Sequence, residues 1–419
     1  MLKRLLKIKD SAEFKNIFSL FSATIFTQVI GLIATPFLTR FFLPASFGLF
    51  TSFNSIVALL TQISNGRFAL SIVVPKEDEE AHALWLFSRK ITLVLSLLVL
   101  SVCLVLMLFF FRQNSIVWVI FLPLMFILVG LNEATNYYLT RLKAFKTMAN
   151  GMMLLSFSNF TIAIILGFSG LVQQFGLIIS IVLGQVVANI YYLTQINARL
   201  KTVSFNLSAY SPLFLLKKYK SYPIYGLPSA VVSTLGQQIF VYYLTLSHDA
   251  DTTGFYGLSL RIVQVPMALI TSSINSVILN KMSTEIHNNR SVEPIIRNTS
   301  RNIALLCIPI IIITYLLAPW GFKFIFGEKW AMSGVFAQYL IIIYSIRITV
   351  SPISTIFIVK NRLNIDLKWQ ITSLLTMSLF LVCSNQWGLS FLSVIQYAIF
   401  IELILYAYYF SLALKESKV

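Results

Sequence analysis

Residues 197–222, NARLKTVSFNLSAYSPLFLLKKYKSY, divide the chain into two matching sets of hydrophobic runs. This stretch is the longest hydrophilic connection in the sequence, lies at the middle of the 419 residues and carries five Lys or Arg. Six apolar runs precede it and six follow it. Each run has about 20 residues, the length that an α-helix needs to cross a bilayer.

The overall composition also indicates a membrane protein. Hydrophobic residues make up 57% of the chain and charged residues only 11%, whereas a soluble domain carries about 25% charged residues. The bilayer is therefore the expected solvent, and we predict an all-α polytopic membrane protein with about twelve transmembrane helices. The predicted spans are 17–39, 44–64, 84–110, 115–139, 150–170, 175–196, 223–246, 254–279, 303–325, 331–358, 367–385 and 389–413.

Lys and Arg fall into every second gap between the hydrophobic runs, which predicts the topology. Basic residues near span ends stay in the cytoplasm during insertion. Both termini are therefore predicted to be cytoplasmic, and the first run is interpreted as an uncleaved span rather than a signal peptide. The basic gaps hold 26 of the 32 Lys and Arg: 1–16, 65–90, 140–150, 197–222, 280–302, 359–369 and 414–419.

The two halves of the chain resemble each other at one junction. A shift of 206 residues places Phe37-Leu38-Thr39 on Tyr243-Leu244-Thr245, and Gly48 on Gly254. These positions are topologically equivalent and keep the same orientation, so we predict a parallel repeat. The predicted architecture is an N-terminal six-helix lobe (1–200), a cytoplasmic linker (201–222) and a C-terminal six-helix lobe (223–419). A pseudo-two-fold along the membrane normal relates the lobes, with a central cavity between them.

Four arginines lie inside or beside the predicted spans. Arg347 is within the tenth span and Arg261 within the eighth, while Arg40 and Arg67 follow the first and second. A charge inside the bilayer costs several kcal/mol and normally faces a cavity or a partner. These side chains are therefore candidates for holding an anionic headgroup by bidentate contacts. The alternatives are ion pairing within the protein and snorkelling to the interface.

Two acids lie within spans and are the natural partners of these arginines. Glu133 is in the fourth predicted span and Glu402 in the twelfth. Both are candidates for coupling to a proton or sodium gradient, and pairing with arginine is the alternative role. No cofactor is predicted.

Other chemistry is weakly supported. The pair Asp249 and Asp251 has a spacing that can hold a divalent metal, but its connection is short, so we expect a solvated turn and no metal site. The cysteines lie in apolar runs without a CxxC partner, which indicates small buried hydrophobes: Cys103, Cys307 and Cys383. The net charge of +17 is spread over separate connections, which argues against nucleic acid as a partner.

Four stretches of the sequence contain motif-like patterns. They are TRFFLPASFG (39–48), GRFALSIVVPK (66–76) followed by EEA (79–81), YKSYPIYGLPS (219–229) and FGEKWAMSG (326–334). Together they resemble motifs of polysaccharide transporters. The chain is similar in this respect to the polysaccharide-transport family of the multidrug/oligosaccharidyl-lipid/polysaccharide (MOP) exporter superfamily, and within it to O-antigen flippases of the Wzx type.

The resemblance implies movement of an undecaprenyl-pyrophosphate-linked oligosaccharide from the cytoplasmic to the periplasmic leaflet of a bacterial inner membrane by alternating access. It implies membrane lipids and other polysaccharide-assembly proteins as partners, and no enzymatic activity. Arg40, Arg67 and Lys329 occupy motif positions. The family loop usually has Tyr-Glu after the arginine, whereas this chain has Phe68-Ala69, so a role for that glutamate is in doubt and Arg67 is freer to meet a substrate.

Two rival functions stay open on the sequence alone. One is a drug or lipid II exporter of the same superfamily, although lipid II exporters usually have fourteen spans. The other is an enzyme, an O-antigen polymerase, which would need an extracytoplasmic loop of more than about 40 residues to hold two substrates.

Overall fold

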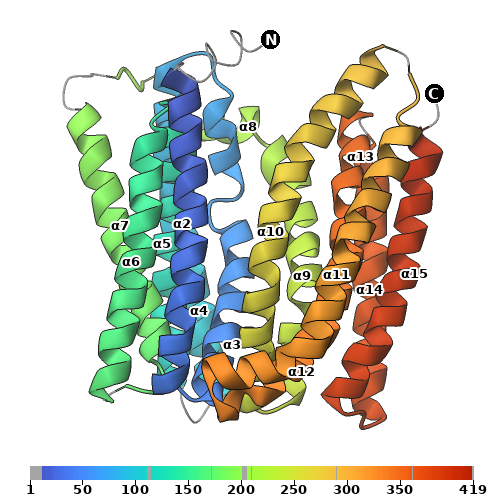
Figure 1. Ribbon diagram of the computed structural model, residues 1–419. Helices are drawn as coiled ribbons and strands as arrows, with labels where there is room; N and C mark the ends of the chain where they lie inside the picture. Colours follow the sequence, from blue (N-terminus) through green and yellow to red (C-terminus); the bar gives the residue numbers. More distant parts are fainter. Residues whose placement is uncertain are drawn as a thin grey trace. The chain divides into compact units, whose positions relative to one another are not determined.

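The computed structural model describes residues 12–110, 115–170, 172–200, 205–208, 210–288, 290–360 and 362–417, and within these ranges every regular element is a helix (Figure 1). Ten of the described helices are long and apolar enough to cross a membrane. The prediction of an all-α polytopic membrane protein is therefore confirmed. These ten spans belong to α2 (Ala12–Phe41), α3 (Pro44–Ile63), α4 (Asp78–Phe110), α5 (Ser115–Arg141), α6 (Phe145–Ser169), α7 (Gly176–Leu200), α11 (Glu293–Phe326), α12 (Ala331–Val350), α14 (Leu363–Gln386) and α15 (Phe391–Ser417).

Two further long helices cover the predicted spans 223–246 and 254–279. They are α9 (Leu227–Ser247) and α10 (Ala250–His287). Both helices are long enough to cross a bilayer, and their sequences include many Ser, Thr and Gln. The predicted count of twelve spans thus remains a prediction. The short elements are η1 (Phe68–Val73), α8 (Pro212–Lys218), η2 (Tyr222–Gly226), η3 (Glu328–Trp330), η4 (Ser351–Ser354) and α13 (Thr355–Val359).

Many hydroxyl side chains within the spans donate a hydrogen bond to a carbonyl of their own helix. In α2, the hydroxyl of Thr24 donates to the carbonyl of Leu20 (3.0 Å) and that of Thr35 donates to the carbonyl of Gly31 (2.6 Å). This bond to the preceding turn leaves no donor unpaired in a medium without water. Polar residues are thereby accommodated along otherwise apolar helices.

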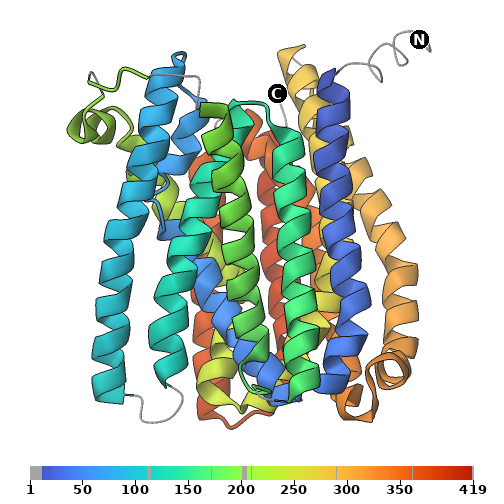
Figure 2. The ribbon, with the colours of Figure 1, turned by 90° about the vertical axis from the view of Figure 1, so that its left-hand side faces the viewer.

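The described chain forms two compact units. The first comprises residues 1–42 and 53–234, and the second residues 43–52 and 235–419. Within the first unit, α2 packs against α6, α4 against α5, and α6 against α7, and Figure 2 shows these helices running alongside one another. Within the second unit, α12 packs against α10, α11 and α15. These units are defined by contacts between residues and not by the sequence repeat. The predicted lobes (1–200 and 223–419) and the linker (201–222) therefore stay a prediction.

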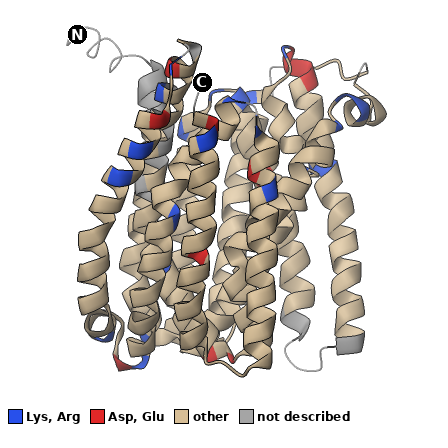
Figure 3. Cartoon of the chain, turned by 90° about the vertical axis from the view of Figure 1, so that its right-hand side faces the viewer, with Lys and Arg blue, Asp and Glu red and all other residues tan. Residues whose placement is uncertain are grey.

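Charged residues of the second unit gather at the ends of the helices, and long stretches between the ends carry few of them (Figure 3). The side chains between the ends are largely exposed apolar groups, such as Leu316 on α11 and Leu379 on α14. An apolar surface of this extent fits contact with lipid rather than water.

The predicted repeat has a structural counterpart where α3 and α10 begin. A Cβ atom on Gly48 would lie 1.8 Å from the carbonyl oxygen of Ala250, and one on Gly254 would lie 1.9 Å from that of Pro44. The shift of 206 residues maps the first contact onto the second. Both helices can approach this closely only because neither glycine has a side chain.

A third contact supports the same symmetry. A Cβ atom on Gly257 would lie 2.0 Å from the hydroxyl oxygen of Thr51, and these two positions are themselves related by the shift. A residue that faces its own repeat equivalent lies on the local two-fold axis, so the axis passes between α3 and α10 at this point.

The connection after α7 is attached to the acidic start of α4. The carboxylate of Glu80 accepts hydrogen bonds from Lys218 Nζ (2.5 Å) and Tyr219 Oη (2.9 Å). Farther out, Tyr210 donates to Glu77, which raises the pKa of Tyr210 to about 12. The described part of this connection is therefore docked on the first unit.

Candidate functional site

A polar pocket of about 400 Å³ lies in the first unit. Its wall is formed mainly by the second half of α5, where Asn132, Glu133, Asn136 and Thr140 occupy one face at helical spacing. Polar groups are costly in a membrane helix and are usually kept for binding or transport. We therefore take this pocket as the first candidate site.

Glu133 is held in the pocket by uncharged donors. Its Oε2 atom accepts a hydrogen bond from Asn65 Nδ2 (2.7 Å) and a longer one from Ser64 Oγ (3.5 Å). Asn65 also accepts, through Oδ1, from the backbone N–H of Ala69 (3.4 Å). The turn after α3 thus fixes the carboxylate of an acid that comes from α5.

Two asparagines complete the wall of this pocket. Asn132 donates to Gln185 Oε1 (3.0 Å), and Asn136 donates to Asn132 Oδ1 (2.8 Å). The Oδ1 atom of Asn136 is buried and accepts no hydrogen bond within the described part of the chain. The sequence prediction missed these asparagines, although their spacing of four residues beside Glu133 on a membrane helix was a usable signal.

Arg67 lies close to this group in an uncommon backbone conformation. It has φ 64° and follows Gly66 with φ 57°, which makes a tight turn between α3 and η1. Its Nη1 atom donates to Gln62 Oε1 (3.0 Å), and its charge acts on Glu133. The acid on which the charge of Arg67 acts therefore comes from α5 and not from the loop that follows Arg67.

The departure from the family motif after Arg67 has a packing explanation. Phe68 and Ala69 are both buried in the core that η1 forms with α4 and α5, and Phe68 packs edge-on against Phe87. A glutamate at the place of Ala69 would be fully buried there, which is costly without a partner.

Arg347 and Glu402 meet within the second unit. Nε and Nη2 of Arg347, on α12, donate to the two carboxylate oxygens of Glu402, on α15, and the Nε contact is 3.2 Å. This is the planar two-bond geometry that makes arginine–carboxylate pairs strong. Of the alternatives for Arg347, ion pairing is the one present in the structure.

The pair is enclosed, which determines its energetics. The side chains of Arg347 and Glu402 are 19% and 4% exposed, and the guanidinium carbon lies 5.5 Å from the ring centre of Tyr344. Burying two charges costs several kcal/mol, which a well-formed pair roughly offsets. Removal of one partner leaves an uncompensated charge and costs about 3–5 kcal/mol.

The other predicted site residues are more dispersed along the chain. Arg261 is partly buried on α10, Arg40 is exposed in the last turn of α2, and Lys329 is exposed in η3. The structure joins Arg347 to Glu402 in an ion pair and places Arg67 near enough for its charge to act on Glu133. A role for Arg40, Arg261 and Lys329 in binding stays a prediction.

The motif around Lys329 is mainly a packing device. Trp330 is 1% exposed and its ring centre lies 4.9 Å from that of Phe47. A Cβ atom on Gly334 would lie 2.5 Å from the Cα atom of Pro319. Trp330 thus packs against α3, and Gly334 lets α12 approach α11 closely, so the motif has a structural role besides any role of Lys329.

Asp249 caps α10, as the expectation of a turn requires. Its Oδ1 atom accepts from the backbone N–H of Thr252 (2.9 Å), and the hydrogen bonds from Thr252 lower the pKa of Asp249. The neighbouring His248 packs against Tyr243 and Phe391, and burial lowers its pKa. The described residues include no group of three or more His, Cys, Asp or Glu arranged to hold a metal.

Comparison with known proteins gives a family match over most of the chain. A family model described as "Polysaccharide biosynthesis protein" matches residues 37–334. The chain is also 23% identical over 288 residues to the teichuronic acid biosynthesis protein TuaB of Bacillus subtilis (strain 168). This match covers 67% of the chain and 57% of TuaB, so the chain spans somewhat more than half the length of that relative.

Solved structures share the fold. An inward-facing multidrug resistance MATE family transporter of the MOP superfamily superimposes with a TM-score of 0.73 at 14% identity, covering 96% of the chain and 99% of that protein. A MOP superfamily transporter from Pyrococcus furiosus gives 0.64 at 14% identity, covering 97% and 96%. The predicted two-lobe fold of this superfamily is therefore confirmed.

Proposed function

The chain belongs to the polysaccharide biosynthesis protein family, and from this membership and the transporter fold we propose that it is a lipid-linked oligosaccharide flippase. Its cargo is an undecaprenyl-pyrophosphate-linked oligosaccharide, an O-antigen or related surface polysaccharide repeat unit. The cargo moves from the cytoplasmic to the periplasmic leaflet of a bacterial inner membrane by alternating access. Both termini lie in the cytoplasm, and the partners are membrane lipids and other polysaccharide-assembly proteins.

A pyrophosphate and many hydroxyl groups cannot cross hydrocarbon unaided, because each would lose its water without replacement. The observation that supports a polar path is the buried Arg347–Glu402 pair. A guanidinium binds phosphate with the same two-bond geometry as carboxylate. The pyrophosphate therefore competes with Glu402 for Arg347.

Such an exchange also suggests the coupling step. When Arg347 turns to the cargo, Glu402 is left in an enclosed position without its partner, which is costly for a carboxylate. A proton or a sodium ion from the membrane gradient removes that cost. Glu133, held by Asn65 and Ser64, is the second acid proposed to follow the gradient.

The rival function as a polymerase is disfavoured by the connections on the side with few basic residues. In the described ranges these connections have only a few residues, such as 387–390 between α14 and α15, and are far shorter than the loop needed to hold two substrates. Export of drugs by the same fold would be independent of any polyprenyl carrier. The following experiment therefore distinguishes a drug exporter from a flippase.

The test uses single and paired replacements at the buried ion pair, in cells that carry the chain as their sole flippase. Arg347→Ala is expected to abolish surface polysaccharide and to let the lipid-linked repeat unit accumulate on the cytoplasmic leaflet. Arg261→Ala is expected to have the same effect. The paired variant Arg347→Met/Glu402→Leu removes both buried charges, so it is expected to regain thermal stability without regaining transport.

Arg362→Ala is the matched control, because Arg362 also forms an ion pair, with Glu416 at 3.8 Å, but is largely exposed. It is expected to leave polymer levels unchanged. Normal polymer in the paired variant would exclude Arg347 from cargo binding. Normal polymer on deletion of the whole chain, with loss of drug resistance instead, would favour the exporter.

A further inference from the structure

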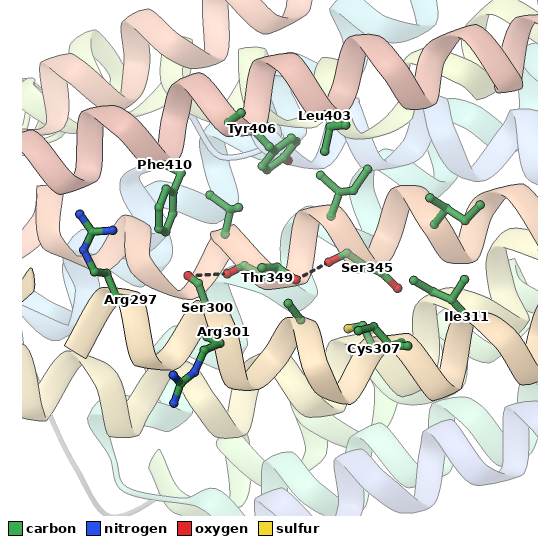
Figure 4. Close-up of a pocket in the computed structure, with 16 residues that line it drawn as sticks. Arg297, Ser300, Arg301, Cys307, Ile311, Ser345, Thr349, Leu403, Tyr406 and Phe410 are labelled. Atoms are coloured by element: carbon green, nitrogen blue, oxygen red, sulfur yellow. Dashed lines mark hydrogen bonds between the residues drawn. The ribbon is translucent and has the colours of Figure 1, made fainter. Parts of the chain in front are cut away.

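A cleft of about 610 Å³ runs between α11, α12 and α15, within the second unit (Figure 4). Neither Arg347 nor Glu402 lines it, although the adjacent residues Ile346 and Leu403 do. In Figure 4, Arg297 and Arg301 of α11 lie toward one end, Ile311 lies toward the other, and Tyr406 and Leu403 of α15 form the opposite wall.

The interior of the cleft is effectively apolar. Two of its few hydroxyls are already used, since Ser300 donates to the carbonyl of Thr349 (3.0 Å) and Thr349 donates to that of Ser345 (2.7 Å). The buried hydroxyl of Ser345 has no hydrogen-bond partner among the described residues. Aliphatic and aromatic side chains, among them four isoleucines of α11 and α12, form most of the remaining lining. Such a surface accepts a hydrocarbon chain and offers little to a sugar.

The two arginines give the cleft a cationic end. Arg297 uses Nε to bind Glu293 (2.7 Å), which leaves its remaining N–H groups for other acceptors. Arg301 is exposed and makes no ion pair with any residue in the described ranges. Two guanidinium groups one helical turn apart are well suited to hold a phosphate.

The length of the cleft matches one leaflet. Arg297 and Ile311 are 14 residues apart on α11, which corresponds to about 21 Å along the helix. Half of the hydrocarbon core measures about 15 Å, so the cleft extends from the headgroup level to about the midplane. The acyl chains of one leaflet fill this same depth, so one acyl chain fits the cleft.

From the charge at one end, the apolar interior and this length, we propose that the cleft binds one anionic glycerophospholipid of the surrounding bilayer. Its phosphate lies at Arg297 and Arg301, and one acyl chain lies between α11 and α15. The lipid belongs to the leaflet on the side of residues 280–302, which the distribution of basic residues predicts to be cytoplasmic.

Native mass spectrometry of the purified full chain, titrated with phosphatidylglycerol and separately with phosphatidylcholine, tests this site. The unmodified chain is expected to prefer phosphatidylglycerol. Arg297→Gln/Arg301→Gln is expected to weaken its binding by about twentyfold. The matched control Arg290→Gln/Arg362→Gln removes two arginines outside the cleft and is expected to keep full affinity.

A variant without a charge change tests the apolar part. Ala304 lines the cleft, so Ala304→Phe is expected to fill it and release the lipid. On the unmodified chain, a photoreactive phosphatidylglycerol is expected to label peptides of α11 and α15. Equal binding by all variants, or labelling confined to other helices, would overturn the proposal. Displacement of phosphatidylglycerol by polyprenyl phosphate at equal concentration would overturn it too, by assigning the cleft to the carrier.

Discussion

Charged side chains within the apolar helices differ in how they are compensated. Glu402 has a guanidinium directly opposite, whereas Glu133 accepts hydrogen bonds from a neutral amide and a hydroxyl. Neutral donors stabilise a carboxylate less than a paired charge does. Replacement of Glu402 therefore disturbs the structure most, while replacement of Glu133 mainly changes the charge of its pocket.

The cap of α10 provides a test outside the membrane spans. Because hydrogen bonds from Thr252 lower the pKa of Asp249 in the folded protein, its ionised form stabilises the fold above the unfolded pKa of about 3.9. That contribution is lost as the pH falls through the lower, folded value. Asp249→Ala is expected to cost about 1 kcal/mol at neutral pH, measured as a lower thermal midpoint in detergent.

Asp249→Asn serves as the control for this prediction. Asparagine caps a helix about as well as aspartate but does not titrate. The variant is expected to keep stability at neutral pH and to lose less of it on acidification than the unmodified chain. If the stability of this variant fell on acidification as much as that of the unmodified chain, the pH dependence would come from groups other than Asp249.

At the scale of helices, close backbone approach organises the junction of α3 and α10. A Cβ atom added to Gly48 or to Gly254 would lie less than 2 Å from a carbonyl oxygen of the other helix. A membrane interior offers little hydrophobic drive for helix association, so close van der Waals contact has to provide it. The two glycines are therefore structural requirements of the repeat.

Gly48→Ala is expected to force the helices apart and to destabilise the protein by about 2–3 kcal/mol, as overpacked sites do. Gly321→Ala on α11 is the matched control, since no heavy atom lies within 4 Å of an added Cβ there. It is expected to raise stability by about 0.5–1 kcal/mol. Thermal unfolding in detergent measures the stability of both variants. Equal effects of the two substitutions would contradict a structural role for the close contact between α3 and α10.

The sequence was sufficient to predict where the helices lie, but not to predict which side chains of different helices pair. The apolar runs predicted helices at all twelve places, because length and hydropathy are local properties. The glycine match at a shift of 206 residues also had a direct counterpart in the fold. The pairing of Arg347 with Glu402, by contrast, depends on packing between helices 55 residues apart, and the sequence left it as one of several alternatives.

At the scale of the whole chain, the two compact units exchange segments. Residues 43–52 belong to the second unit although both neighbouring segments belong to the first, and α9 passes from one unit to the other after residue 234. The described connection after α7 is meanwhile held on α4 by Glu80. The chain therefore passes between units within continuous helices as well as through loops.

Expression of the halves tests this arrangement. Residues 1–222 and 223–419, produced together as separate polypeptides, are expected to assemble and to restore surface polysaccharide. The second half produced alone is expected to aggregate, because Gly254 then lacks its contact with Pro44. Size-exclusion chromatography measures assembly, and a monodisperse second half on its own would contradict the exchange of residues 43–52.

The placement of residues 43–52 in the second unit affects the order in which the protein assembles during synthesis. During synthesis, its binding surface on α10 does not exist until some 200 further residues have been inserted. The first half must therefore wait in the membrane with an unfilled contact, open to any helix with small residues. Assembly of the second half is then the event that completes the first, so the two repeats mature as one product and not as successive modules.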